Sequence, residues 1–154
     1  MRPEAGDQKS EIRGRKSEIG SWWSKNNSYE MKLNSATDLD VYKKAYQLAM
    51  TIFWLSKSFP HEERFALTGQ IRRSSRSVCL NLREAWSKRR YEAHFVSKLT
   101  DCDGENSETD SSLDFAKDCG YIMAECHKEL TALCQEVGRM LGSMIKNPGP
   151  FLKR

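Results

Sequence analysis

The chain has 154 residues, a length that fits one domain with a tail. Hydrophobic residues make up 38% of it and charged residues 30%, which excludes wholesale disorder. No apolar run approaches the roughly 20 residues that a membrane helix needs, and the first thirty residues lack the apolar segment of a signal peptide. Five cysteines, an odd number without a CxxC pair, indicate reduced thiols. These features predict a soluble cytoplasmic protein that contacts no membrane.

The net charge of +4 is unevenly distributed along the chain. Residues 61–90 carry +5, and residues 91–119, which follow directly, carry −6. If these segments lie on neighbouring helices, the molecule has a positive and a negative side. Either self-assembly or a polyanionic partner would use such a distribution.

The first part of the chain divides into an extension and a helix. Residues 1–37 hold Gly, Ser, Asn and scattered charges without a sustained period, which predicts a flexible N-terminal extension. The first helix is predicted from a Thr37/Asp38 cap to Phe59, where Pro60 ends it. Its apolar residues recur at three- and four-residue steps, as one buried stripe requires: Val41, Ala45, Leu48, Ala49, Ile52, Leu55 and Phe59.

Three further helices are predicted, over residues 62–86, 91–118 and 124–146. The second and fourth have clear apolar stripes, whereas Asn106 and Thr109 interrupt the stripe of the third.

Short loops between these long amphipathic helices favour antiparallel neighbours. The predicted fold class is therefore all-α, an antiparallel up-down-up-down four-helix bundle over residues 38–147. The Asn-Pro-Gly-Pro sequence at 147–150 ends the last helix, and residues 148–154 are predicted to be a flexible tail.

Candidate sites for catalysis or metal binding are weak. The acidic segment 101–105 resembles the start of a calcium loop, but Asn106 and Ser112 occupy the positions that need Gly and Glu. His127 and the nearby cysteines are too widely spaced for a structural zinc motif. The fingerprints of nucleotide-binding loops and of nucleophilic enzymes are absent. The sequence therefore predicts no enzyme activity, no metal and no cofactor.

Arginines on one face of the second predicted helix give a clearer signal. At about 100° per residue, Arg72, Arg76, Arg83 and Arg90 lie within roughly 40° of each other and about 120° from the apolar stripe. Guanidinium groups in such a row can each fork onto a phosphate, and a phosphate polymer gains entropy by releasing counterions there. A solvated basic face, or one that pairs with the acidic third helix across the bundle or between subunits, explains the same pattern.

The sequence resembles a known family from Asp38 to Lys146. The most specific part is the run from Leu67 to Arg73, with Asn81 and Glu84 following. These segments are similar to the four-helix-bundle proteins encoded within intervening sequences of bacterial 23S ribosomal RNA genes. That family includes the accessory variability proteins of diversity-generating retroelements.

The resemblance implies a homopentamer of bundles. For the retroelement members it also implies binding of nucleic acid and a reverse transcriptase through basic surfaces. Arg72 and Arg73 match the family directly, whereas Arg76 and Arg83 are added from the helical wheel.

Two functions remain open from the sequence. The first is a non-enzymatic, oligomeric accessory protein that binds the RNA or DNA backbone with little sequence specificity. Its predicted contacts are Arg72, Arg73, Arg76, Arg83, Lys88, Arg89 and Arg90. The alternative is a protein-interaction scaffold in which this basic face meets the acidic third helix of a neighbouring subunit. A small-molecule pocket at Asn106 and Thr109 is a third possibility, although hydrogen bonds between buried polar groups explain these residues equally well.

Overall fold

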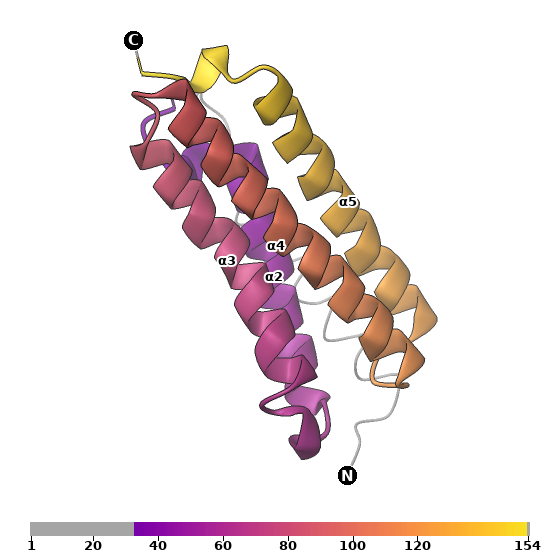
Figure 1. Cartoon of the computed structure of the whole chain (residues 1–154). Helices are drawn as coiled ribbons and strands as arrows, with labels where there is room; N and C mark the ends of the chain where they lie inside the picture. Colours follow the sequence, from indigo (N-terminus) through magenta and orange to yellow (C-terminus); the bar gives the residue numbers. More distant parts are fainter. Residues whose placement is uncertain (1–32, 154) are drawn as a thin grey trace.

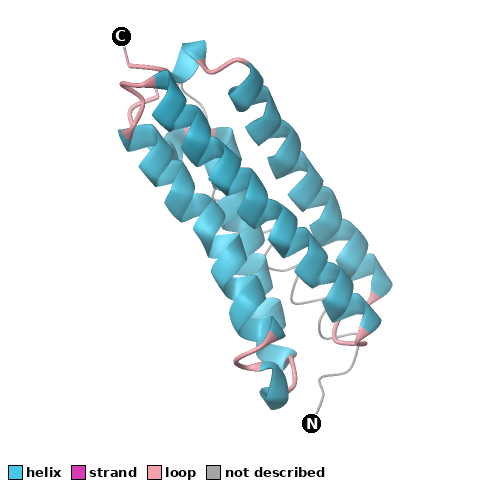
Figure 2. Cartoon of the chain, viewed as in Figure 1, coloured by secondary structure: helices cyan, strands magenta, loops and turns pink. Residues whose placement is uncertain are grey.

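The computed structural model describes residues 33–153, which form a bundle of four long helices (Figures 1 and 2). The long helices are α2 (Asp40–Leu55), α3 (Leu67–Ser87), α4 (Glu92–Asp118) and α5 (Ala124–Lys146). Short 3-10 helices flank them: η1 (Ala36–Asp38), η2 (Ser56–Ser58), η3 (His61–Glu63) and η4 (Gly149–Phe151).

Each long helix packs against two others, α2 and α4 both lying between α3 and α5. This arrangement confirms the predicted all-α four-helix bundle. No helix within residues 33–153 is long and apolar enough to cross a membrane.

Helix bounds differ from the prediction mainly at the first two helices. The first ends at Leu55 and continues only as the short turn η2, and the second begins at Leu67 rather than near residue 62. Glu63 explains the later start, because one of its carboxylate oxygens accepts a hydrogen bond from the Leu67 backbone N–H at 3.1 Å. Residues 61–63 form the 3-10 helix η3, and the backbone leaves helical geometry at Ala66, with φ −112° and ψ −109°, before α3 begins.

The folded part begins earlier than predicted and extends further at the C-terminal end. Of the predicted extension, residues 1–32 lie outside the described residues, whereas Ala36 is buried within η1, whose capping box is formed by Ser35 and Asp38. At the other end, where a flexible tail was expected, Phe151 packs against Phe95 with ring centroids 6.4 Å apart. Through this apolar contact, residues 149–151 pack against the bundle.

The core consists of two apolar clusters separated by a polar layer. One cluster centres on Leu82, Phe95 and Leu141, and the other on Ile52, Leu113 and Leu130. The residues of the polar layer are Ser74, Ser75, Asn106, Thr109 and Ser112, all buried.

Hydrogen bonds explain why the polar layer is tolerated inside the bundle. The Ser74 and Thr109 hydroxyls lie 2.8 Å apart, and Asn106 Nδ2 donates to the Cys134 carbonyl at 2.8 Å. These bonds offset part of the cost of burying the layer, in which Asn106 Oδ1 has no hydrogen-bond partner within residues 33–153. These bonds join α3 to α4 and α4 to α5, and they give the irregular stripe of α4 a structural role.

Candidate nucleic-acid interface

Arg72 lies on the side of α3 that faces α2. Its Nε donates to the Ser56 hydroxyl at 2.7 Å, and its Nη2 donates to the Phe53 carbonyl at 3.4 Å. Partial burial, followed by the positive charge of Arg76, lowers the pKa of Arg72 from its usual value. This guanidinium therefore helps to hold α2 against α3, in addition to carrying charge at their surface.

Arg76 and Arg83 are exposed and rest on aromatic rings of α2. The Arg76 guanidinium carbon lies 5.5 Å from the Phe53 ring centroid, and that of Arg83 lies 5.7 Å from the Tyr42 centroid. Within residues 33–153, neither arginine forms an ion pair with a carboxylate. Both positive charges are therefore available to an external anion.

The aromatic partners were not predicted from the sequence as part of the site. Tyr42, Tyr46 and Phe53 fall within about 40° of each other at 100° per residue, so a helical wheel of α2 could have found them. Lys57 joins them, with its ammonium 5.0 Å from the Phe53 ring centroid and 4.2 Å from that of Trp54. We call this combined surface of α2, η2 and α3 the basic-aromatic face: Tyr42, Tyr46, Phe53, Trp54, Lys57, Arg72, Arg76 and Arg83.

Arg73 points to the opposite side of α3, toward α4. Its Nη2 lies 2.8 Å from Glu108 Oε1, and its Nη1 lies 3.6 Å from Glu105 Oε1. Hydrogen bonds from Gln70 and then Arg73 hold the pKa of Glu108 below its usual value. The basic and acidic helices thus meet within one chain at this point, and Arg73 is separated from the basic-aromatic face.

The remaining predicted residues lie at the turn after α3. Lys88 pairs with Glu84 at 3.1 Å, and Arg89 stacks 3.5 Å from the Trp86 ring centroid while its Nε donates to the Trp86 carbonyl. Arg90 is exposed next to them. The structure therefore divides the seven predicted residues into three places, and only Arg72, Arg76 and Arg83 share the basic-aromatic face.

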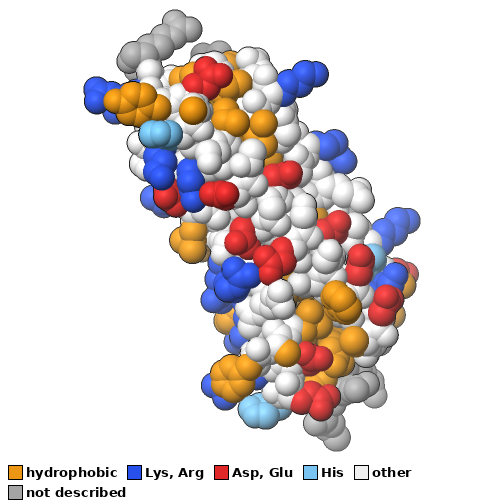
Figure 3. Space-filling model, in the orientation of Figure 1, with side chains coloured by type: hydrophobic (Ala, Val, Ile, Leu, Met, Phe, Trp, Pro, Cys, Tyr) orange, Lys and Arg blue, Asp and Glu red, His pale blue; other side chains and the backbone are white. Residues whose placement is uncertain are grey.

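Basic and acidic side chains occupy different parts of the molecular surface. Figure 3 shows Lys and Arg side chains along the margin that α3 follows and Asp and Glu side chains over α4 beside it. The molecule thus presents adjacent basic and acidic strips, as the uneven charge of the sequence indicates.

The cysteines and histidines contribute no cluster in the described part of the chain. No three His, Cys, Asp or Glu side chains within residues 33–153 are placed to hold a metal ion. Cys126 and Cys134 are buried in the core, and His127 Nε2 lies 2.6 Å from Asp114 Oδ1. Burial raises the pKa of Cys134 to about 12, so this thiol behaves as a core side chain.

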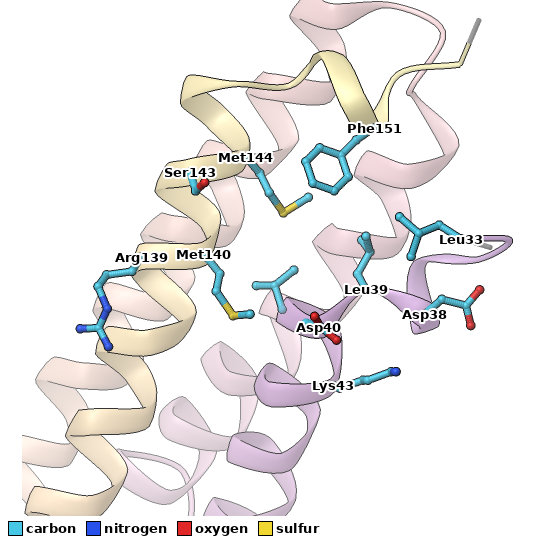
Figure 4. Close-up of a pocket in the computed structure, with 11 residues that line it drawn as sticks. Leu33, Asp38, Leu39, Asp40, Lys43, Arg139, Met140, Ser143, Met144 and Phe151 are labelled. Carbon is cyan, nitrogen blue, oxygen red and sulfur yellow. The ribbon is translucent and has the colours of Figure 1, made fainter. Parts of the chain in front are cut away.

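A cavity of about 660 Å³ lies at the end of the bundle, between the start of α2 and the end of α5. Figure 4 shows Met144 and Phe151 pointing toward each other and Met140 pointing toward the start of α2, while Arg139 extends away. Neither Asn106 nor Thr109 lines this cavity; the Thr109 hydroxyl and Asn106 Nδ2 form hydrogen bonds within the core. The cavity lining combines these apolar side chains with polar ones: Asp38, Asp40, Lys43, Arg139 and Ser143.

The geometry defines an all-α bundle in which arginine side chains of α3 lie over aromatic rings of α2. Residues 37–143 match the family described as 23S rRNA-intervening sequence protein, and the chain belongs to that family.

A solved relative has the same fold. The crystal structure of a protein of unknown function from the S23 ribosomal protein family of Bacteroides thetaiotaomicron VPI-5482 is similar, with 30% sequence identity and a TM-score of 0.63. The match covers 70% of this chain and 96% of that one. No curated protein matches the chain.

Proposed function

We propose that this protein is a non-enzymatic, oligomeric accessory protein that binds RNA through its basic-aromatic face. The observation that carries the proposal is that Arg76 and Arg83 are exposed, rest on aromatic rings and pair with no carboxylate in the described residues. A family description that names an intervening sequence of 23S rRNA supports RNA as the polyanion.

The arginine row suits a phosphate backbone. At a rise of about 1.5 Å per residue, Arg72 and Arg83 are roughly 16 Å apart along α3, which is the length of about five stacked nucleotides. A guanidinium can fork onto two phosphate oxygens, and contacts of this kind position a nucleic acid without reading its sequence. We therefore expect binding with little sequence specificity.

The scaffold reading has less support from the geometry. It needs the acidic residues of α4 to be available to a neighbouring subunit, yet two of them, Glu105 and Glu108, already pair with Arg73 of their own chain. Arg76 and Arg83 face α2 instead of α4.

A salt-dependent titration tests the proposal. Fluorescence anisotropy with a labelled RNA at about 50 and 200 mM salt should show tight binding that weakens steeply, by roughly a thousandfold for six phosphate contacts. Absence of binding at the lower salt concentration would contradict the proposal and leave the scaffold as the better explanation. Binding that does not depend on salt would also contradict it, because phosphate contacts must release counterions.

A further inference from the structure

The basic-aromatic face contains exposed aromatic rings, which contact with a phosphate backbone alone would not require. Tyr46 is 48% exposed, and its ring stacks on that of Tyr42 with centroids 6.2 Å apart and planes inclined by 21°. Tyr42 also contacts the guanidinium of Arg83. A cation and two nearly parallel rings are therefore neighbours, with the ring of Tyr46 open to solvent.

A second aromatic cluster lies farther along α2. The Phe53 ring has three cations around it, because the Arg72 guanidinium carbon and the Lys57 ammonium each lie 5.0 Å from its centroid and Arg76 lies at 5.5 Å. Trp54 meets Phe53 edge-on, with centroids 5.2 Å apart. At about 1.5 Å per residue, Phe53 lies roughly 10 Å from Tyr46 along the helix, or about three stacked nucleotides.

An exposed leucine lies within the arginine row. Leu80 is 68% exposed and stands one helical turn from both Arg76 and Arg83, so these three side chains share one face of α3. An apolar side chain gains nothing from a phosphate, but it can pack against the face of a base. Its position adds a third apolar contact surface among the cations.

We propose that the ligand of this face is single-stranded RNA, with unpaired bases stacking on Tyr46 and near Phe53 while Arg76 and Arg83 hold the adjoining phosphates. In a duplex each base face is covered by the next base pair, so a duplex could use the arginines but not the rings. A single strand can use both, as in other proteins that combine a basic surface with aromatic platforms. This inference rests on the proposed function, which would hold equally for a duplex.

The test compares two forms of one RNA and two aromatic variants. An unstructured RNA of about 15 nucleotides is titrated alone and as a duplex with its complement, using the full chain and fluorescence anisotropy at low salt. Tyr46→Ala removes the exposed ring. Phe115→Ala is the matched control, because Phe115 is 65% exposed on α4 and lies outside the basic-aromatic face.

The expected result is that the single strand binds more tightly than the duplex. Tyr46→Ala should weaken single-strand binding by about tenfold and leave duplex binding unchanged, and Phe115→Ala should change neither. Equal or tighter binding of the duplex, or an unchanged single-strand affinity in Tyr46→Ala, would overturn this inference while leaving the proposed function intact. Failure of both RNA forms to bind would reject the proposed function itself. A circular-dichroism melt of each variant shows whether the fold is retained.

Discussion

Arg72 and Arg73 are neighbours in sequence but have different surroundings in the fold. A helix turns about 100° between them, so Arg72 reaches Ser56 beside α2 while Arg73 reaches Glu108 of α4. These are the two positions that the family resemblance marks most directly, yet each makes a contact within the chain. On the basic-aromatic face, Arg76 and Arg83, which the helical wheel adds, are exposed and pair with no carboxylate within residues 33–153.

Glu108 should limit the affinity for RNA, because its carboxylate neutralises Arg73, a predicted RNA contact on the α4 side of α3. Glu108→Gln removes that negative charge and should strengthen RNA binding at low salt by roughly twofold to fivefold. Asp103→Asn is the control, because Asp103 is exposed on the same helix and forms no ion pair within residues 33–153. Anisotropy titrations of both variants check the expectation. An equal gain in both would show a general effect of net charge, and a loss in Glu108→Gln would contradict the account.

At the scale of the elements, the end of α4 depends on one glycine. Gly120 has a φ of 77°, and its N–H donates to the Lys117 carbonyl while the Tyr121 N–H donates to the Ala116 carbonyl. This is a Schellman ending, in which a left-handed residue terminates the helix and returns the chain toward α5. Gly104, in the middle of the same helix, has ordinary helical geometry.

These two glycines give a matched prediction, because an added Cβ would meet nothing within 4 Å at either position. Gly104→Ala should stabilise the protein by about 0.5–1 kcal/mol, since alanine loses less backbone entropy in a helix. Gly120→Ala should destabilise it by about 1–2 kcal/mol, since a Cβ strains the left-handed conformation. Urea unfolding of both variants measures the two free energies. Changes of the same sign would show that backbone conformation does not decide the outcome.

The sequence predicts most of the fold because the relevant patterns are local. The stripe of the first helix is buried from Val41 to Phe59, and the last helix has the predicted bounds. The later start of α3 is harder to foresee, because it depends on where the Glu63 side chain places its carboxylate.

The site is less predictable than the fold. Which arginine faces α2 and which faces α4 depends on how the helices pack, and local periodicity does not contain that information. The pairing of Arg73 with Glu108 is one result of this packing. The aromatic row of Tyr42, Tyr46 and Phe53 is visible on a helical wheel, but its meaning becomes clear only when the cations of α3 lie over it.

At the scale of the whole molecule, the basic and acidic strips lie side by side on one bundle (Figure 3). The ion pair between Arg73 and Glu108 joins the two strips and neutralises one charge of each within the chain. The homopentamer and the contact with a reverse transcriptase, which the family resemblance implies, stay predictions. Because Arg76 and Arg83 point away from the α4 carboxylates, RNA binding and assembly should respond separately to changes at these residues.

The most direct measurement is the RNA affinity of the double variant Arg76→Gln, Arg83→Gln at low salt. Removing both charges should weaken binding by at least tenfold and flatten its salt dependence, because about two phosphate contacts are lost. Lys128→Gln with Arg139→Gln removes the same charge from exposed positions on α5 and should bind almost normally. Size-exclusion chromatography should show the same assembly state for both. An unchanged affinity in the first variant, or loss of assembly with it, would contradict the account.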